Sequence, residues 1–334
     1  MTTPELAAQF EGKRVLVTGG LGFIGSSLAR ELVAGGADVL LVDSMIPEYG
    51  ANVANIADIE DRVTVNIADV RDVHSLPYLV RGRDVIFNLA GQTSHLDSMA
   101  DPYTDLDINC RAQLSILEAC RAVNPNARVV FASTRQIYGR PDYLPVDEAH
   151  PVRPVDVNGI NKTAGEWYHL LYGQIYGIPV CVLRLTNTYG PRMRVRDARQ
   201  TFLGYWLRQI ILGEELLVFG DGGQRRDFNY VDDAVRALLL AAVRDEAVGQ
   251  VYNLGDDEVM SLLELAKLLV RLNGSGSYRV VPFPDERKAI DIGDYFSDFT
   301  KIRSELGWEP AVPLQDGLAR SIEFYREHGQ AYWG

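Results

Sequence analysis

Short apolar runs alternate with longer amphipathic segments over the first half of the chain. The runs are continuous stretches of Val, Ile, Leu and Phe, which are typical of strands buried on both faces of a parallel sheet. They predict strands at 15–17, 39–42, 63–67, 85–89, 129–132 and 180–185. The segments between them predict helices, among them 26–33, 102–123 and about 159–176. Strands that alternate with helices predict an α/β fold, a Rossmann-type doubly wound parallel sheet.

The pattern changes after residue 186. Glycines and prolines punctuate shorter elements there, and helices are predicted near 201–212, 231–244, 261–272 and 314–327. An apolar run at 251–254 predicts a strand that returns to the main sheet. With 334 residues, the chain is long for one compact core. We therefore expect a sheet domain over 1–186, with the returning strand near 250–255, and a smaller mixed α/β lobe over 187–334 that is not fully contiguous.

The first predicted strand leads into three evenly spaced glycines and then into a helix. Gly19 lets the chain turn, Gly22 lets the backbone approach a ligand, and Gly25 lets helix and strand pack closely. Phe23 and Ile24 belong to the same loop. A strand, a glycine turn and a helix N-terminus together bind a dinucleotide pyrophosphate, because the positive end of the helix dipole faces the anion. The sequence therefore predicts a dinucleotide site here.

The second predicted strand ends in Asp43, at about the distance where an acidic residue meets an adenosine ribose. Ser44, Met45 and Ile46 follow, and none of them could bind a 2′-phosphate through a positive charge. This favours NAD over NADP.

Further polar and small residues follow the other predicted strands, at the sheet edge where ligands bind in such folds. Asp69, followed by Val70, stands where a carboxylate could accept a hydrogen bond from an adenine, although it could equally be a plain strand-end residue. The fourth strand ends in Leu89, Ala90 and Gly91, where small residues allow a cofactor to come close. Ser133 and Thr134 end the fifth strand.

The composition excludes several classes of partner. The formal net charge is −12 and there is no basic block, which argues against a nucleic-acid partner. No apolar run reaches the roughly 18 residues of a membrane span, and the first residues do not resemble a signal peptide. Cys110, Cys120 and Cys181 lack metal-ligand spacing, so we expect reduced thiols and no metal. We expect a cytoplasmic protein that binds neither nucleic acid nor membrane.

Six motifs carry a resemblance to a known family. They are TGGLGFIG (18–25), NLAGQ (88–92), FASTRQIYG (131–139), RLTNTYGPR (184–192), GDGGQRRDFNYVDD (220–233) and DFTKIRSELGWEP (298–310). In order and spacing they resemble the extended short-chain dehydrogenase/reductase family, specifically its nucleotide-sugar epimerases and dehydratases, over nearly the whole chain. The AGQ loop with the later STxxxYG most resembles the UDP-galactose 4-epimerase and CDP-sugar 2-epimerase branches.

The resemblance assigns roles to individual residues. The three glycines and Asp43 would hold NAD, with Asp69 and Val70 near the adenine. Thr134 would bond the reacting sugar hydroxyl, and Lys162 would hold the nicotinamide ribose.

The resemblance also implies a nucleotide-diphosphate sugar as partner. Asn187 and Arg226 would contact the diphosphate, since a planar guanidinium fits phosphate well. Either Arg287 or Lys288 would take a second phosphate-contacting position, and the spacing to later aspartates favours Lys288. Alternatively, Asn187 could cap a turn, and Arg226 could pair with a neighbouring aspartate, Asp227 or Asp232.

The family's central acid/base, a Tyr four residues before the Lys, is missing. Asn158 stands at that position, and no Tyr in the chain precedes a Lys by four. A phenol beside a lysine can lose its proton and then take one from a substrate hydroxyl. An amide can orient a hydroxyl but cannot accept its proton.

A second departure follows Thr134. The resembling 4,6-dehydratases carry Asp-Glu there and the decarboxylating relatives carry Glu at the second position, whereas this chain carries Arg135 and Gln136. Elimination of water and decarboxylation by that route are therefore disfavoured.

A different residue could supply the missing base. His95 follows the NLAGQ motif, and imidazole titrates in the right range, although a lone loop histidine is also typical of a solvated surface. Four arginines, Arg192, Arg194, Arg196 and Arg199, could likewise shape a substrate pocket or form a solvated face.

These observations favour an NAD-dependent nucleotide-sugar epimerase, which oxidises a sugar carbon, lets the keto-sugar present its other face and reduces it again. One alternative is a protein that binds NAD and a sugar nucleotide with little catalysis. Another is an NAD-linked oxidoreductase of small hydroxyl substrates, which the diphosphate-type Asn187 and Arg226 oppose. The helices near 102–122 and 160–176 carry apolar residues on more than one face, so we also expect a homodimer through a four-helix bundle.

Overall fold

The computed structural model describes residues 1–199, 201–285, 288 and 290–333. Its largest sheet in this part of the chain has seven strands in the order β11-β6-β5-β4-β1-β2-β3, and all neighbouring pairs are parallel. The strands are β1 (Arg14–Thr18), β2 (Asp38–Asp43), β3 (Thr64–Ile67), β4 (Val85–Asn88), β5 (Arg128–Thr134), β6 (Val180–Leu185) and β11 (Val251–Asn253). This confirms the predicted Rossmann-type sheet.

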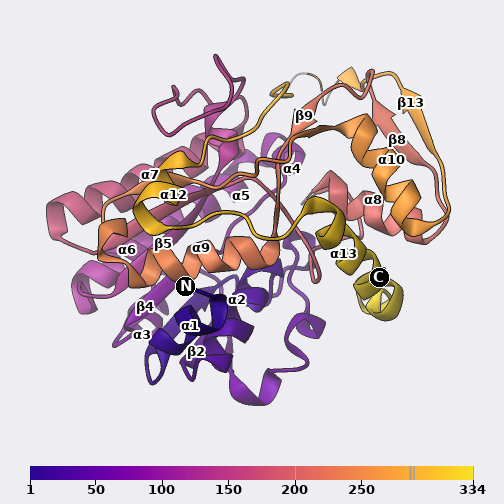
Figure 1. The fold of residues 1–334 in the computed structure, drawn as a ribbon. Coiled ribbons are helices and arrows are strands. Elements are labelled where there is room, and N and C mark those ends of the chain that lie inside the picture. Colours follow the sequence, from indigo (N-terminus) through magenta and orange to yellow (C-terminus); the bar gives the residue numbers. More distant parts are fainter. Residues whose placement is uncertain (200, 286–287, 289, 334) are drawn as a thin grey trace.

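Helices cover both faces of the sheet (Figure 1). One face carries α1 (Thr3–Ala7), α2 (Phe23–Ala34) and α9 (Val231–Val243), and the other carries α3 (Leu76–Val80), α6 (Ala112–Val123) and α7 (Val157–Tyr176). Successive strand residues point to opposite faces, so Val15 and Val17 join the first core and Leu16 joins the second. Because the central strands are buried on both sides, they appear in the sequence as apolar runs, whereas the edge strand β3 is largely exposed.

The helix predicted over 102–123 is helical throughout, but it is not one regular α-helix. It consists of α5 (Pro102–Leu106), a π-helical turn at Asp107–Arg111, and α6. Buried Asn109 lies in the π turn, where its Nδ2 donates to Gln92 O (2.9 Å) and to Asp105 Oδ2 (3.0 Å). Such turns are frequent at functional sites.

The second half of the chain forms smaller sheets and helices above the carboxyl ends of the main strands. Three two-stranded pairs lie there: β7 (Asn187–Tyr189) with β10 (Phe228–Tyr230), β9 (Arg225–Arg226) with β12 (Met260–Ser261), and β8 (Leu216–Phe219) with β13 (Tyr278–Val281). The helices are α8 (Phe202–Ile211), α10 (Leu262–Asn273), α12 (Thr300–Leu306), α13 (Leu314–His328) and α14 (Gln330–Trp333). The short strands and α12 escaped the sequence-based prediction.

The two halves of the chain share one core. Helix α9 lies beyond the expected boundary at 186, yet it packs against β5 and β6. Strand β11 comes from the same half and pairs with β6. The expected division into two domains stays a prediction.

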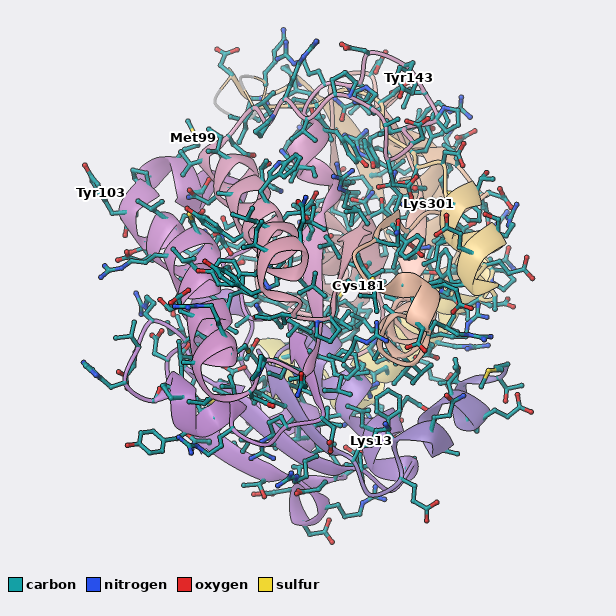
Figure 2. All side chains as sticks on the ribbon, turned by 90° about the vertical axis from the view of Figure 1, so that its left-hand side faces the viewer. Lys13, Met99, Tyr103, Tyr143, Cys181 and Lys301 are labelled. Carbon is teal, nitrogen blue, oxygen red and sulfur yellow. The ribbon has the colours of Figure 1, made fainter. Side chains whose placement is uncertain are left out.

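The surface beside α4 (His95–Ala100) and α5 carries large apolar side chains. Figure 2 shows Met99 and Tyr103 pointing away from the molecule, and they are 51% and 78% exposed. Cys181 lies inside, fully buried, and the three cysteines are free thiols. None of the helices that the structure describes has the length and apolar character needed to cross a membrane.

Candidate cofactor and substrate pocket

A cavity of about 820 Å³ lies between the carboxyl ends of the main strands and the second half of the chain. Its walls include Gly19, Asp43 and Thr134 from the sheet edge, and Arg226 and Phe219 from the elements above. This is the edge at which open parallel sheets bind ligands.

The glycine turn lines one end of this cavity. Gly19 has a φ of +69°, and Gly22 is the N-cap of α2. A Cβ on Gly25 would lie 2.2 Å from the carbonyl oxygen of Gly19, so no side chain fits there. The first backbone N–H groups of α2, at Phe23 and Ile24, border the cavity and suit a pyrophosphate.

The loop after β4 is fastened to this turn by Thr18. The Thr18 hydroxyl accepts hydrogen bonds from the backbone N–H groups of Leu89 and Ala90, both at 3.1 Å. A Cβ on Gly91 would lie 2.9 Å from Asn109 Oδ1 and 3.1 Å from Lys162 Nζ. Leu89, Ala90 and Gly91 all line the cavity, as expected for a loop that a cofactor approaches closely.

Asp43 and Asp69 lie at the same end of the cavity. Asp43 accepts hydrogen bonds from the backbone N–H groups of Leu21 and Met45, both at 3.0 Å, and burial raises the pKa of its carboxyl. Asp69 forms a two-pronged ion pair with Arg71 at 2.6 Å, which lowers its pKa. Val70 completes this wall.

Lys162 is buried in the cavity wall. Its Nζ donates to Ala132 O (3.0 Å) and lies 4.9 Å from the centre of the Phe131 ring. Within the described ranges no carboxylate pairs with it, and burial lowers its pKa to about 8, against a partly opposing effect of Asp105. The amine is a hydrogen-bond donor held one helical turn from Asn158.

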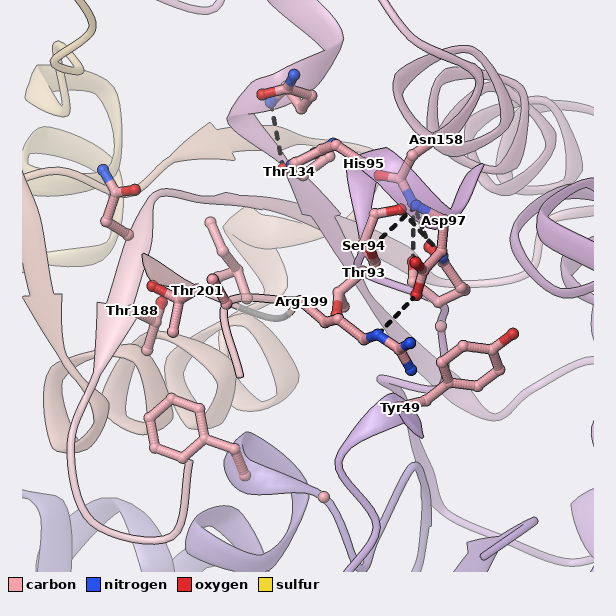
Figure 3. Close-up of a pocket in the computed structure, with 18 of the residues that line it drawn as sticks. Tyr49, Thr93, Ser94, His95, Asp97, Thr134, Asn158, Thr188, Arg199 and Thr201 are labelled. Carbon is pink, nitrogen blue, oxygen red and sulfur yellow. Dashed lines mark hydrogen bonds and ion pairs between the residues drawn. The ribbon is translucent and has the colours of Figure 1, made fainter. Parts of the chain in front are cut away.

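Asn158 is held by a buried polar network (Figure 3). Its Nδ2 donates to Gln92 O (2.8 Å) and to Asp105 Oδ2 (3.0 Å), and its backbone N–H donates to Ser98 Oγ (3.2 Å). Because the amide nitrogen is used in this way, Oδ1 is the side-chain atom left to accept a hydrogen bond from a ligand hydroxyl.

The centre of this network, Asp105, was missed by the sequence analysis. Its carboxylate is 1% exposed and accepts from three amides, those of Asn109 (3.0 Å), Asn158 (3.0 Å) and Asn161 (2.8 Å). The four-residue spacing of Asp105 and Asn109 on a predicted helix was the available signal.

His95 begins α4 and lies in the cavity wall beside Ser94 and Asn158 (Figure 3). Its Nδ1 lies 2.9 Å from Asp156 Oδ2, although the two groups are not aligned as a hydrogen bond. Asp156 is fully buried and caps α7, since its Oδ1 accepts from the Gly159 N–H at 2.7 Å. Burial opposes ionisation of Asp156, but the contact with His95 and its hydrogen bonds lower its pKa. Asp156 was also missed, although an aspartate ahead of a predicted helix is a recognisable cap.

Thr134 ends β5 in the cavity wall, and its Oγ1 accepts from the backbone N–H of Gln136 (3.2 Å). Tyr138, in the same segment, points away from the cavity. It is fully buried, donates to Asn253 Oδ1 (2.7 Å) and accepts from Arg184 (2.6 Å).

Asn187 and Arg226 both line the cavity. Asn187 Nδ2 donates to Asp227 O (2.9 Å), so this side chain bridges two segments. Arg226 is 6% exposed, and burial lowers its pKa to about 10. Its nearest acid is Asp291, at 3.9 Å, rather than either aspartate considered from the sequence.

The structure does not bring Lys288 into the cavity. Lys288 is exposed and lies in a neighbouring smaller hollow, together with Arg140 and Asp294. Arg287, the other candidate for the second phosphate contact, lies outside the described residues.

The four clustered arginines do not act alike. Arg199 lines the cavity, and its Nε lies 3.5 Å from Asp97 across the opening (Figure 3). Arg194 is nearly buried and pairs with Asp197 at 2.6 Å. Arg192 and Arg196 do not line the cavity.

Comparison with known proteins finds one family whose members cover nearly the whole chain. Residues 15–255 match the NAD dependent epimerase/dehydratase family. A putative UDP-glucose 4-epimerase from Methanocaldococcus jannaschii is 31% identical, over 95% of this chain and 99% of that protein. UDP-glucuronic acid decarboxylase 1 from Xenopus tropicalis is 33% identical, over 94% of this chain and 72% of that protein. A dTDP-glucose 4,6-dehydratase from Streptomyces venezuelae, solved with NAD bound, superposes with a TM-score of 0.86 at 30% identity, over 96% and 98% of the two chains.

Proposed function

Because the chain belongs to the NAD dependent epimerase/dehydratase family, we propose that it is an NAD-dependent nucleotide-sugar epimerase. Its relatives include epimerases, decarboxylases and dehydratases, so the choice among these reactions rests on residues of the pocket. The observation that carries the proposal is the identity of the two residues that follow Thr134. Arg135 and Gln136 line the cavity there and offer no carboxylate for elimination or decarboxylation.

NAD is the cofactor of this family, and the residues present fit it. The cradle at Gly19, Gly22 and Gly25 leaves room for a pyrophosphate against the start of α2, and Asp43 stands where an adenosine ribose is bound. Lys162 would hold the nicotinamide ribose through its buried amine. When bound, NAD supplies the redox chemistry, since it accepts a hydride from a sugar carbon and returns it.

In this proposal His95 handles the proton that the missing phenol would have taken. Asp156 favours a proton on Nδ1 of the imidazole, which leaves Nε2 as an acceptor. Thr134 Oγ1 and Asn158 Oδ1 orient the sugar hydroxyl, and His95 takes its proton as the carbon is oxidised. His95 gives the proton back when the carbon is reduced from its other face.

One observation favours a second candidate function, a protein that binds NAD and a sugar nucleotide with little catalysis. Asn158 cannot titrate, and its amide is committed to Gln92 and Asp105. An Asn158 side chain held in this way is compatible with binding of NAD and a sugar nucleotide whether or not a catalytic base is present.

We further propose a homodimer formed through α7. Four apolar side chains recur along one exposed strip of this helix at spacings of seven and four residues, as in a helix–helix seam. They are Ile160, Trp167, Leu171 and Ile175, which are 54%, 61%, 49% and 60% exposed. Exposed strips of this kind mark protein interfaces.

The reaction can be tested by incubating the protein with UDP-, CDP-, GDP- and dTDP-sugars in D2O and analysing the products by mass spectrometry and NMR. An epimerase yields a product of unchanged mass without deuterium at carbon, because the same hydride returns. A product that has lost water or carbon dioxide would contradict the proposal. Bound sugar nucleotide that is recovered unchanged would support the binding protein instead.

The proton carrier is tested separately. His95→Ala should abolish turnover, with His74→Ala as the matched control, because His74 is exposed and lies outside the cavity. Efficient epimerisation by His95→Ala would mean that another group carries the proton.

A further inference from the structure

Arg135 is a cation in the cavity wall without an acidic partner. Its Nη2 donates to Asn187 Oδ1 (3.0 Å), and its guanidinium lies 5.2 Å from the centre of the Tyr295 ring. Its Nη1 is shielded from solvent and has no hydrogen-bond partner among the described residues. This shielded donor adds to the cost of the charge but is out of reach of a ligand, and the rest of the side chain borders the cavity without an acidic partner.

Three aspartates, Asp227, Asp291 and Asp156, act on Arg135 from a distance, and each accepts hydrogen bonds from other groups. Asp227 is fully buried, and its two oxygens accept from Thr186 Oγ1 (2.6 Å) and from the backbone N–H of Ser297 (3.0 Å). In the described part of the chain, no carboxylate lies within 4.0 Å of the Arg135 guanidinium. Burial lowers the pKa of Arg135, which reflects the free-energy cost of keeping this charge away from water.

Two arginines that line the cavity, half-buried Arg135 and buried Arg226, lie close enough to affect each other electrostatically. Arg226 stands on β9 with Asp291 at 3.9 Å, and each positive charge disfavours the other. Arg226 is the residue that we assign to the diphosphate. Arg135 directly follows Thr134, which we assign to the reacting sugar hydroxyl, and it hydrogen-bonds Asn187, so its charge lies between the sugar and the diphosphate positions.

We propose that the sugar of the substrate carries a carboxylate, and that Arg135 is the residue that selects it. This inference rests on the proposed function, because it names the class of nucleotide sugar bound at the same site. A guanidinium offers parallel N–H donors that match the two oxygens of a carboxylate. Asn187 and the Tyr295 ring fix its plane, and Nε, which is not shielded and has no hydrogen-bond partner among the described residues, supplies the unused donor beside Nη2. A neutral sugar would leave the cation unpaired.

The test compares pairs of ligands that differ only in the acidic group. Binding of UDP-glucose and UDP-glucuronic acid is measured by calorimetry on the NAD-loaded protein, with the corresponding CDP, GDP and dTDP pairs in parallel. We expect the acidic member of the pair to bind about 10- to 100-fold more tightly, as for a hydrogen-bonded charge pair. Arg135→Gln should remove this preference, and Arg135→Lys should keep part of it, because the charge stays and the planar donor fork is lost.

A matched control removes the same charge elsewhere. Arg81 is exposed and outside the cavity, so Arg81→Gln should keep the full preference. Thermal unfolding without ligand shows whether Arg135→Gln is folded. We expect unchanged or raised stability, because the substitution removes an unpaired buried charge.

The remaining outcomes separate this inference from the proposed function. Equal binding of neutral and acidic sugars would overturn the inference and leave the proposed function standing. A similar loss of affinity for the acidic sugar, the neutral sugar and the bare nucleoside diphosphate in Arg135→Gln would also overturn it, because Arg135 would then bind the diphosphate. Binding of no sugar nucleotide at all would overturn both.

Discussion

Lys162 offers a test of the pocket that needs no substrate. Its amine is buried, donates a hydrogen bond to Ala132 O and lies over the Phe131 ring. Burial lowers its pKa from 10.5 to about 8. Each tenfold change in a protonation equilibrium corresponds to about 1.4 kcal/mol, so this difference amounts to about 3 kcal/mol. The substitution Lys162→Met keeps most of the volume and removes the charge.

The direction of the effect follows from which state binds the proton more tightly. Between pH 8 and 10.5 the unfolded lysine is protonated and the folded one is mostly neutral, so the unfolded state binds more protons and stability rises with pH. Below pH 8 both states are charged and the folded protein bears the full cost of about 3 kcal/mol. Compared with Lys162→Met, the wild type should gain about 2–3 kcal/mol of unfolding free energy from pH 7 to pH 10.

The measurement is urea unfolding of both proteins at pH 7 and pH 10, at one protomer concentration and without NAD. The contributions of other titrating groups to the free energy of unfolding cancel in the difference between the two proteins. Lys267→Met is the control, because Lys267 is exposed on α10 and its removal should give a difference that does not change with pH. A pH-independent difference for Lys162→Met as well would show that the amine is hydrated in the folded protein, and the reasoning from burial would fail.

Four further outcomes are expected. NAD should bind at least about tenfold more tightly than NADP in calorimetric titration, because the Asp43 carboxylate repels a 2′-phosphate; equal affinities would remove the basis for this preference. Asp156→Asn should lower turnover by about 10²–10⁴-fold while the NAD affinity stays, because His95 loses the partner that holds its proton on Nδ1; unchanged turnover would contradict the role of that pair. In a His95→Ala background, where no other base acts, Asn158→Tyr should restore only part of the turnover, because an acidic sugar repels a phenolate; a failure to rescue would show that a phenol cannot serve from this position. Trp167→Glu should convert a dimer into a monomer in light scattering at micromolar concentration, and a dimer that persists would place the interface elsewhere.

The main sheet could be predicted from the sequence because its central strands are buried on both faces. Runs such as that of β1 and that of β2 admit only apolar residues, and this is visible without knowledge of the fold. The small sheets above the pocket do not appear as apolar runs in the sequence. Strand β9 consists of Arg225 and Arg226 alone, and its pairing with β12 depends on how distant segments meet.

The residues of the pocket also differ in whether they can be predicted from their neighbours in the chain. The glycine turn is a local device, so each glycine can be interpreted from its neighbours in the chain. The contact between His95 and Asp156 joins the starts of two helices, and only the packing of α4 against α7 brings these residues together. The sequence suggested His95 as a base but could not supply the carboxylate that orients it. Likewise, the unpaired state of Arg135 depends on the hydrogen bonds of Asp227, which pattern alone does not show.

The two departures from the family pattern become mutually consistent if the sugar is acidic. A tyrosine base acts as a phenolate, and a phenolate beside a bound carboxylate would be repelled by roughly 4 kcal/mol at about 4 Å and an effective dielectric constant of about 20. An imidazole starts neutral and becomes positive when it takes a proton, so the same carboxylate stabilises the product of that step. Asn158 removes the site of a negative charge, Arg135 adds a positive one, and His95 with Asp156 supplies a base whose charge changes in the favourable direction. A pocket for a neutral sugar has no electrostatic reason to combine these three features.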